Sequence, residues 1–445
     1  MRALWFVAVA ACSATPTSST WRVENGFLHA PDGRVAILRG VNLSGAQKAA
    51  PYIDEKSLAD YQRVEADWGF NAIRFLMTWS AVEPQPGQYD DEYLQQVADR
   101  MEWARATGLS VILDMHEDIY GEGFGFDGAP VWSCDPANYA AFVPATPWYV
   151  NSLDPHVEAC VDSFYTDADT RSRFIAAWQH VARRLAGSPA IVGIDPLNEP
   201  SWGTYPVFQF ERDRLVPLYA DIVAAVRGEA PDWVVFAEPS SSRNIGLDSN
   251  IQSLPFDNAM YAPHSYDSGA ESGSVFDPSH RATILENVAE LATEAQTMHA
   301  GLWIGEYGGD PGAPGIADYM TADYDAAGSA AAGTMYWSYD RGDGDSLLDA
   351  DGAEKPELLA AVVRPYPARV AGTPASYAFD AATSTFTFTY APDRSSSLPT
   401  EIAIPPRLYP SGYQVDCGGC TSHAELGALS IDTPPPGDSV TITVR

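Results

Sequence analysis

Two glutamates each stand at the end of an apolar run, beside residues that commonly end strands. Glu199 lies in Leu197-Asn198-Glu199-Pro200, and Glu306 lies in Trp303-Ile304-Gly305-Glu306-Tyr307-Gly308. Hydrolysis of a glycosidic bond requires one carboxyl group that protonates the leaving oxygen and a second carboxylate on the other side of the sugar. The pair therefore predicts glycoside hydrolysis, with retention of configuration if the carboxyl groups lie about 5 Å apart.

The surroundings of the two glutamates suggest their roles. We predict Glu199 to be the acid/base and Glu306 to be the nucleophile, which donors such as Arg74 and Tyr266 would keep ionised. Asn198 directly precedes Glu199 and could donate a hydrogen bond to the sugar 2-hydroxyl, a contact that strengthens in the transition state. A single Asn-Glu-Pro could equally be a turn or a helix cap, so the prediction depends on the second glutamate.

Apolar runs and amphipathic patterns alternate along most of the chain, and this alternation must position both glutamates. The strand-like runs are Val35–Val41, Ala72–Met77, Ser110–Met115, Ile191–Pro196, Trp233–Ala237, Ala259–Pro263, Leu302–Gly305 and Gly333–Trp337. The helical patterns between them include Leu58–Trp68, Tyr93–Ala106, Thr170–Leu185, Leu215–Val226 and Ile284–His299. Eight β-then-α units predict an α/β fold, the (β/α)8 or TIM barrel.

Polar residues and one Trp lie at or just after the ends of the strand-like runs, apart from Arg74 inside the second run, and this favours a barrel over an open α/β sheet. They are Asn42, Arg74, His116, Glu199, His264, Glu306 and Trp337. In a barrel the carboxyl ends of all strands meet on one face, where catalysis takes place in this fold. The fourth and seventh strands lie across such a barrel from each other, so their glutamates can flank one bond.

Two insertions and a change of hydrophobic pattern interrupt the alternation of strands and helices. Glu117–Asp169 and Asp267–Pro278 would project over the active face, where substrate recognition is their natural use. After residues 364–367, the polar and apolar residues of 384–390, 401–404 and 439–444 alternate as in antiparallel strands. We predict a catalytic barrel over residues 21–365 and a small C-terminal antiparallel β-sandwich over residues 366–445.

The composition excludes some classes of protein. The chain has 445 residues, and 59 acidic against 26 basic residues give a net charge of −33. Such a charge repels phosphate backbones, so nucleic acid is not an expected partner. No apolar run beyond the N-terminus approaches the roughly 18 residues of a membrane-spanning helix. We expect a monomer that meets a membrane only through its substrate and through a lipid anchor.

The first 20 residues resemble a secretory signal. Met1-Arg2 is followed by the apolar run Ala3–Ala11, and Val9-Ala10-Ala11-Cys12 is similar to a bacterial lipobox in which Cys12 becomes lipidated. An ordinary signal peptide or a misassigned start codon are the alternatives. We expect a secreted protein or one anchored at the cell envelope.

The remaining four cysteines are even in number, as an oxidising compartment would suit. We predict disulfides between Cys134 and Cys160 and between Cys417 and Cys420. A zinc site at the second pair would need further Cys or His ligands, and a redox role would need a strand–helix unit. The sequence also lacks the His-x-His and His-Glu-x-x-His patterns of metal enzymes. We therefore expect no metal and no cofactor.

The polar residues at the strand ends resemble the usual set of glycoside hydrolase family 5. That family is expected to place an Arg after strand two, a His after three, Asn-Glu after four, His-x-Tyr after six, Glu after seven and Trp after eight. The corresponding residues here are Arg74, His116, Asn198, Glu199, His264, Tyr266, Glu306 and Trp337. The resemblance implies substrate contacts for these side chains in addition to the two catalytic glutamates.

Several segments are more closely similar to the endoglycoceramidases of that family. They are Leu38–Asn42, Asp114–Asp118, the stretch around Asp127-Gly128-Ala129-Pro130 and Val363–Pro367. The resemblance implies a substrate that is a glycosphingolipid, cut between oligosaccharide and ceramide, and sugar contacts by Lys48 and Asp118. Glu117 departs from the pattern, since the resemblance leads us to expect Gln there.

Other functions remain open at this stage. An endo-β-glucanase or steryl-β-glucosidase of the same family would have a long polar cleft or a sterol-sized pocket. A non-catalytic protein that binds carbohydrate or lipid would have no need of two facing carboxylates. The aromatic side chains of the first insertion suit a ceramide site, although they could also simply pack that insertion onto the barrel.

Overall fold

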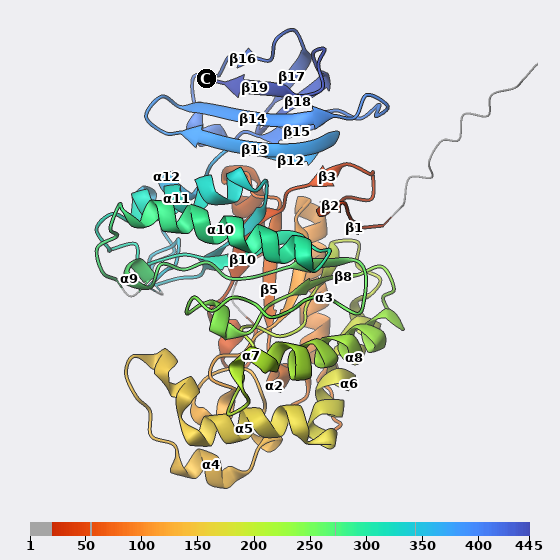
Figure 1. Ribbon diagram of the computed structural model, residues 1–445, viewed down its shortest axis with the longest axis vertical. Helices are drawn as coiled ribbons and strands as arrows, with labels where there is room; N and C mark the ends of the chain where they lie inside the picture. Colours follow the sequence, from red (N-terminus) through yellow and green to blue (C-terminus); the bar gives the residue numbers. More distant parts are fainter. Residues whose placement is uncertain (1–19, 54–55, 272, 343) are drawn as a thin grey trace, which may run out of the picture.

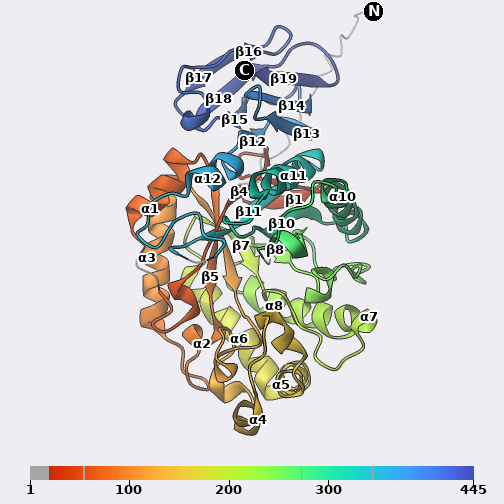
Figure 2. The ribbon, with the colours of Figure 1, turned by 90° about the vertical axis from the view of Figure 1, so that its left-hand side faces the viewer.

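Eight parallel strands close into a barrel at the centre of the molecule (Figures 1 and 2). The computed structural model describes residues 20–53, 56–271, 273–342 and 344–445. The barrel strands are β4 (Arg39–Leu43), β5 (Ala72–Met77), β6 (Ser110–Met115), β7 (Ile191–Asp195), β8 (Val234–Ala237), β9 (Ala259–Tyr261), β10 (Gly301–Tyr307) and β11 (Gly333–Tyr339). Nearly all of their residues are buried, as expected of parallel strands covered on both faces. The predicted (β/α)8 fold is confirmed.

The predicted strands agree with the structure except at the start of the barrel. β5 and β6 have the predicted bounds, and β7 to β11 lie within two residues of theirs. The predicted strand Val35–Val41 is instead two strands, β3 (Val35–Ala36) and β4, which belong to different sheets. Ile37 and Leu38 between them are also buried, so hydrophobicity continues across the break and cannot mark it.

Helices surround the barrel in the order that the periodicity predicts. They are α1 (Leu58–Gln62) with η2 (Arg63–Asp67), α2 (Trp79–Val82), α3 (Asp91–Thr107), α6 (Ala168–Leu185), α7 (Val207–Phe210) with η6 (Glu211–Leu215), α8 (Val216–Arg227), α9 (Ser268–Glu271), α10 (His280–Thr297), α11 (Ile316–Ser329) and α12 (Pro356–Val362). Between β8 and β9, where all residues are described, there is only the short 3-10 helix η7 (Ser241–Arg243).

Helix α6 illustrates how the sequence positions the active face. The Asp167 carboxylate accepts a hydrogen bond from the N–H of Thr170 and so caps the helix start. Phe174, Trp178 and Val181 recur at helical spacing and form its buried face. Trp178 Nε1 donates to the Pro196 carbonyl at 2.8 Å, which ties the helix to the chain just before Glu199.

The first insertion carries more regular structure than its composition suggests. It contains η3 (Glu122–Phe124), η4 (Val131–Ser133), α4 (Pro136–Ala141), η5 (Trp148–Leu153) and α5 (Pro155–Thr166). The Asp135 and Asp154 carboxylates cap α4 and α5, each just before a proline at the first helical position. Cys134 and Cys160 are joined by a disulfide, which closes the insertion at its base. The insertion lies at the end of the molecule remote from the C-terminal strands (Figure 1).

The C-terminal strands form two facing sheets together with strands from the N-terminus. They are β12 (Tyr366–Val370), β13 (Gly372–Asp380), β14 (Thr385–Pro392), β15 (Thr400–Ala403), β16 (Val415–Asp416), β17 (Thr421–Glu425), β18 (Ala428–Thr433) and β19 (Val440–Val444). One sheet has the order β13-β14-β19-β16, and the other joins β12, β15, β18 and β17 to β1 (Arg22–Glu24), β2 (Phe27–His29) and β3. Residues 22–36 therefore precede the barrel in sequence but pair with the C-terminal strands.

These sheets pack closely against the barrel. The Tyr324 hydroxyl donates to the Pro365 carbonyl at 2.6 Å, and the Tyr377 hydroxyl donates to the Ala332 carbonyl at 2.8 Å. Gly328 in α11 allows this approach, because a Cβ there would lie 2.1 Å from the Tyr377 carbonyl oxygen. Cys417 and Cys420 form a disulfide in the connection between β16 and β17.

The N-terminal signal and the predicted lipidation of Cys12 lie outside the described residues. Within the part of the chain that the structure describes, no helix combines the length and the apolar character needed to cross a bilayer.

Candidate active site

Arg74 on β5 lies at the centre of a buried hydrogen-bond network at the carboxyl ends of the strands. Its guanidinium contacts Glu306 Oε1 at 2.6 Å, Glu238 Oε1 at 2.8 Å and Asp195 Oδ2 at 2.9 Å. It also lies 3.0 Å from Asp114 Oδ1. Burial alone would lower the pKa of Arg74, but these four carboxylates outweigh it and raise the pKa well above its ordinary value. The guanidinium therefore stays charged in the interior.

Glu306 on β10 is held by donors on both carboxylate oxygens. Arg74 donates to Oε1, and the Tyr266 hydroxyl donates to Oε2 at 2.9 Å. The side chain is only 6% exposed. These two donors hold the carboxyl group in one orientation, as a nucleophile requires.

Glu199 follows β7 in a strained backbone conformation. Its φ is +41°, in the left-handed region that non-glycine residues rarely adopt. Its backbone N–H donates to Glu238 Oε2 at 2.8 Å, which helps to fix this turn. Glu199 Oε1 accepts from Asn244 Nδ2 at 2.6 Å and lies 2.7 Å from His264 Nδ1. With 26% of its side chain exposed, Glu199 is more accessible than Glu306.

The two glutamates face one another across the barrel. A carboxylate oxygen of Glu199, a ring nitrogen of His264 and a carboxylate oxygen of Glu306 all lie within 4.8 Å of one another. Retaining glycosidases have carboxyl groups about 5–5.5 Å apart, whereas inverting ones leave roughly 6.5–9.5 Å for a water molecule. The separation is therefore that of a nucleophile and an acid/base acting on one bond.

His264 supplies a second buried positive charge. Burial alone would lower the pKa of His264, but the negative charges of Glu238 and Glu306 outweigh it and raise the pKa well above its ordinary value. Its Nε2 lies 3.2 Å from Glu238 Oε1, on the side of the ring away from Glu199. The imidazolium thus partly neutralises the cluster of acids at the floor of the site.

His116, Trp337, Lys48 and Asp118 form a polar wall next to the carboxyl pair. The rings of His116 and Trp337 stack with centroids 5.3 Å apart, and Lys48 Nζ lies 4.6 Å from the Trp337 ring centroid. Lys48 also forms an ion pair with Asp118. Stacked rings beside charged hydrogen-bonding groups suit the faces and hydroxyls of a sugar.

His116 is prepared to accept a hydrogen bond. Burial lowers its pKa well below the ordinary value, and the charges of Lys48 and Arg74 add to this, so the ring is neutral. Its Nδ1 lies 2.8 Å from Asp114 Oδ2, so we assign the proton to that nitrogen. The buried Nε2 has no hydrogen-bond partner among the described residues, so it can accept from a substrate hydroxyl.

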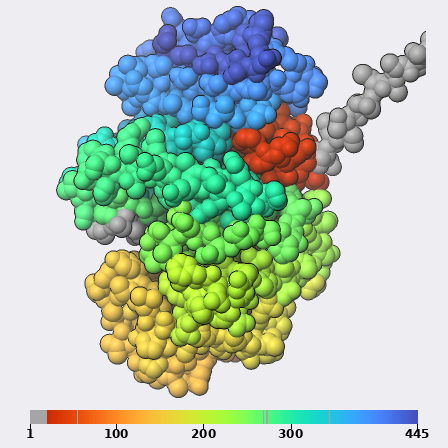
Figure 3. All heavy atoms as spheres, in the orientation of Figure 1, coloured from red at the N-terminus to blue at the C-terminus, as the bar shows by residue number. Residues whose placement is uncertain are grey.

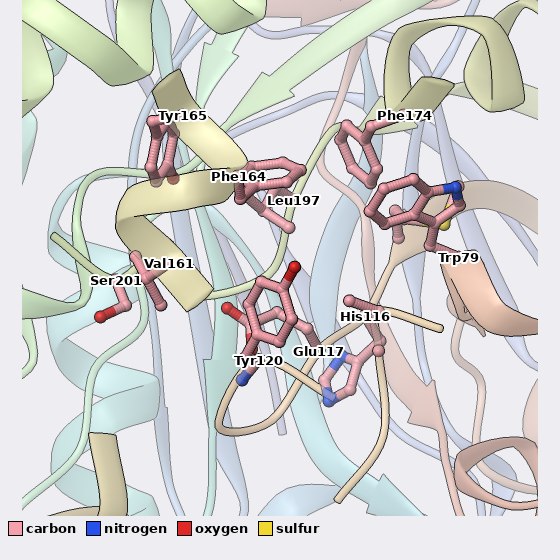
Figure 4. Close-up of a pocket in the computed structure, with 13 residues that line it drawn as sticks. Trp79, His116, Glu117, Tyr120, Val161, Phe164, Tyr165, Phe174, Leu197 and Ser201 are labelled. Carbon is pink, nitrogen blue, oxygen red and sulfur yellow. Dashed lines mark hydrogen bonds between the residues drawn. The ribbon is translucent and has the colours of Figure 1, made fainter. Parts of the chain in front are cut away.

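A small apolar cavity lies on the other side of His116 (Figure 4). Trp79 and Phe174 form one side of it. Another side is formed by Phe164 and Tyr165, which belong to the insertion helix α5. The remaining lining residues are Met115, His116, Glu117, Tyr120, Gly128, Ala129, Val161, Leu197 and Ser201. Leu197 and Ser201 flank Glu199 in the sequence, so the cavity adjoins the segment that carries this glutamate.

All of the predicted site residues meet on this face. Arg74, Asn198, Glu199, His264, Tyr266 and Glu306 belong to the buried network, and Lys48, His116, Asp118 and Trp337 form the wall. Asn198 Oδ1 accepts from Arg74 at 2.9 Å, and its Nδ2 donates to the Glu117 carbonyl at 3.1 Å. Asn198 is thus held rigidly, with a second amide N–H left over for a sugar hydroxyl.

Sequence reasoning missed four residues that position this site. Asp114 and Asp195 are acidic residues inside apolar strands, and such a placement was a usable signal of a buried ion pair. Glu238 directly follows the apolar run Trp233–Ala237, and a carboxylate at that place was also a usable signal. Asn244 follows a short 3-10 helix, and nothing in the local sequence distinguishes it from an ordinary loop residue.

A closed (β/α)8 barrel with two facing carboxyl groups at its carboxyl-terminal end defines a glycoside hydrolase. Residues 31–343 match the family described as cellulase (glycosyl hydrolase family 5), and residues 364–444 match the glycoside hydrolase family 5 C-terminal domain. The chain belongs to glycoside hydrolase family 5, and it acts on O-glycosyl bonds.

Relatives within this family include endoglycoceramidases, which confirms the predicted resemblance. Endoglycoceramidase I of Rhodococcus hoagii is 28% identical over 436 residues, which cover 92% of this chain and 85% of the relative. Endo-glycoceramidase II from Rhodococcus sp. is 30% identical and covers 94% of this chain. Its lactosyl-enzyme intermediate superposes with a TM-score of 0.83 over 99% of that chain, and its ganglioside GM3 complex with 0.84 over 98%.

A more distant structure shares the fold alone. Sterylglucosidase 1 of Cryptococcus neoformans has a TM-score of 0.80 and 96% coverage of both chains, at 16% identity.

Glu117 should make stability depend on pH. Burial raises the pKa of Glu117 to about 8. The hydrogen bond from the Tyr120 N–H acts to lower this pKa, whereas the negative charges of Asp118, Glu199 and Glu238 raise it further. The unfolded chain ionises this group near its ordinary value of 4.5, so the folded state loses stability as the pH rises from there to about 8. Glu117→Gln removes this loss. We expect the stability of the variant relative to wild type to increase between pH 5 and 8 and then to level off, as measured by urea unfolding.

Glu286→Gln is the matched control, since Glu286 is exposed on α10. Its stability difference from wild type should stay constant over the same pH range. An equally flat difference for Glu117→Gln would show that Glu117 is not held in an apolar setting.

Proposed function

We propose that this protein is a retaining endo-β-glycosidase that hydrolyses the bond between the oligosaccharide and the ceramide of glycosphingolipids. The observation that carries the proposal is the Glu199–Glu306 pair beside a polar wall, with an apolar cavity behind His116 of that wall. The names of the relatives support it, since they are endoglycoceramidases and one was captured with ganglioside GM3.

The environments of the two carboxyl groups support their roles. In the first step the Glu306 carboxylate attacks the anomeric carbon, the glycosidic C–O bond breaks, and Glu199 gives its proton to the leaving ceramide oxygen. In the second step Glu199 takes a proton from water, whose oxygen attacks the same carbon and releases Glu306. Glu306 is fixed by Arg74 and Tyr266, whereas the partly exposed Glu199 can be reached by the water of the second step.

The apolar cavity supports a lipid leaving group. The leaving oxygen must lie next to the acid Glu199, and Leu197 and Ser201 of the cavity wall flank that residue in the sequence. Trp79, Phe164 and Phe174 pack edge to face there and present an apolar surface. Transfer of hydrocarbon from water into such a site is favourable by about 25 cal/mol per Å².

Substitution of the two glutamates should separate their roles. Glu306→Gln should lower kcat by about 10⁴-fold or more on every substrate, because no covalent intermediate can form. Glu199→Gln should lower kcat on lipid glycosides by about 10²–10⁴-fold. It should spare formation of the glycosyl-enzyme from a dinitrophenyl glycoside, whose leaving group needs no proton, and added azide should then yield a β-glycosyl azide.

Stopped-flow release of dinitrophenol and product analysis measure these effects. Glu122→Gln, elsewhere in the insertion, provides a control that should keep wild-type turnover. Wild-type turnover by Glu306→Gln would contradict the assignment, and an α-glycosyl azide would contradict retention.

A substrate panel tests the aglycone. We expect intact oligosaccharide and ceramide to be released from gangliosides or other glycosylceramides, because the cavity is apolar and the wall is polar. β-Glucans should be poor substrates. Steryl glucosides form the informative comparison, since the sterylglucosidase fold is shared and a sterol is also apolar. Mass spectrometry of the released sugar and lipid decides among them, and cleavage of steryl glucosides alone would contradict the ceramide assignment.

We also propose that the protein is secreted and anchored through a lipidated Cys12, on the strength of Met1-Arg2 and the Val9-Ala10-Ala11-Cys12 sequence. A mature N-terminus that begins at Cys12 with a diacylglyceryl mass increment is the expected result. A mature protein that begins elsewhere without this increment would contradict the anchor. One chain brings together both glutamates, the polar wall and the apolar cavity, so we further propose that a monomer is active.

A further inference from the structure

Large exposed apolar side chains gather on the active face of the molecule. Within the described ranges, the two exceptions are Leu398 and Leu426, which lie in loops between C-terminal strands. The others follow the carboxyl ends of barrel strands: Leu58, Val131, Val143, Trp148, Tyr149, Leu153, Phe208, Ile245 and Val275. Apolar side chains that are exposed close together usually mark an interaction site, whereas scattered ones do not.

The densest group lies in residues 142–153, which we call the docking segment. Val143 is 74% exposed, Leu153 57%, Tyr149 52% and Trp148 48%. The insertion that contains this segment occupies the end of the molecule opposite the C-terminal strands (Figures 1 and 3).

The docking segment is held in shape before it meets a partner. The buried side chain of Asn151 accepts from the N–H of Ala145 at 2.7 Å and donates to the carbonyls of Ala145 and Trp148 at 3.1 and 2.6 Å. The Cys134–Cys160 disulfide closes the insertion below it. The segment therefore presents its apolar side chains without a large loss of conformational entropy on binding.

The charge pattern indicates the chemistry of the partner. Residues 136–153 contain no charged side chain, and the chain has no Lys or Arg between Arg105 and Arg171. The nearest charges along the chain are the acids Asp135 and Asp154. An anionic lipid surface would meet no cation within this stretch of the chain and would be repelled by these acids and by the net charge of −33. A zwitterionic or uncharged lipid surface carries no such penalty.

We propose that the docking segment inserts Trp148, Tyr149 and Leu153 into an electrically neutral lipid surface and so brings the active face to the bilayer. Amphipathic rings such as Trp and Tyr favour the interface between headgroups and acyl chains. The segment leads directly into α5, whose Val161, Phe164 and Tyr165 line the apolar cavity. This proposal rests on the lipid-linked substrate proposed above, because only such a substrate requires the enzyme to reach a bilayer.

Vesicle binding tests the proposal separately from hydrolysis. The full-length protein is floated with phosphatidylcholine vesicles that contain no glycolipid, with and without phosphatidylserine. We expect binding to pure phosphatidylcholine and weaker binding when phosphatidylserine is added. Trp148→Ser combined with Leu153→Ser should weaken binding by about a hundredfold, because each buried apolar side chain contributes about tenfold. Leu426→Ser, which removes an even more exposed apolar side chain at the other end of the molecule, should bind like wild type.

A charge inserted in the docking segment sharpens the test. Val143→Lys should bind vesicles with phosphatidylserine better than wild type, and Val143→Asp should bind them less well. All variants should keep wild-type turnover of a soluble aryl glycoside, which shows that the fold and the catalytic site are intact.

Three results would overturn the proposal. The first is vesicle binding by the Trp148 and Leu153 double variant that equals wild type. The second is stronger binding of the wild-type protein to vesicles with phosphatidylserine than to those without it. The third is a double variant whose sedimentation coefficient differs from that of wild type while its vesicle binding does not. That result would assign the docking segment to contact with a second copy of the chain. Failure to cleave glycosphingolipids would leave the binding result unchanged and would instead contradict the proposed function.

Discussion

One buried guanidinium holds the active site together. Arg74 faces Asp114, Asp195, Glu238 and Glu306, and its charge offsets part of the cost of burying four carboxyl groups side by side. Even with it, burial raises the pKa of Asp114 and Asp195 well above their ordinary values. Through Glu306 the guanidinium fixes the nucleophile directly. Through Glu238, which accepts the backbone N–H of Glu199, it fixes the turn that carries the acid/base. The positions of both catalytic carboxyl groups thus depend on a single side chain of β5.

Around this network the site is divided by polarity. Lys48, Asp118, His116 and Trp337 offer charge, hydrogen bonds and stacked rings, whereas the cavity next to Glu199 is built mainly from aromatic and aliphatic groups. A substrate that joins a sugar to a lipid can satisfy both sides at once, and a purely polar glucan can satisfy only one. The insertion after β6 makes this division possible, because α5 supplies part of the cavity. The same insertion carries the docking segment, so binding of the lipid and approach to its bilayer depend on one disulfide-closed unit.

The C-terminal strands pack against the end of the barrel opposite the active face. β1–β3 join their sheet before the chain enters the barrel, and α11 approaches β13 closely at Gly328. Arg39 at the start of β4 lies over the rings of Tyr324 and Tyr366, which links a barrel strand, a barrel helix and β12. These contacts restrain the first and last units of the barrel, where the closure between β4 and β11 is made.

Much of this protein is determined locally and could be read from the sequence. The barrel strands have apolar runs of the right length, the two glutamates stand at strand ends, and the four remaining cysteines form the two predicted bonds. Other features arise between residues far apart in the chain, where local patterns carry no information. The pairing of β3 with β12, the bond from Asn244 to Glu199 and the role of Glu238 are of this kind. The sequence determined which side chains could do chemistry. Only the closed barrel decided which of them meet, because the distances between strand ends are set when the sheet closes on itself.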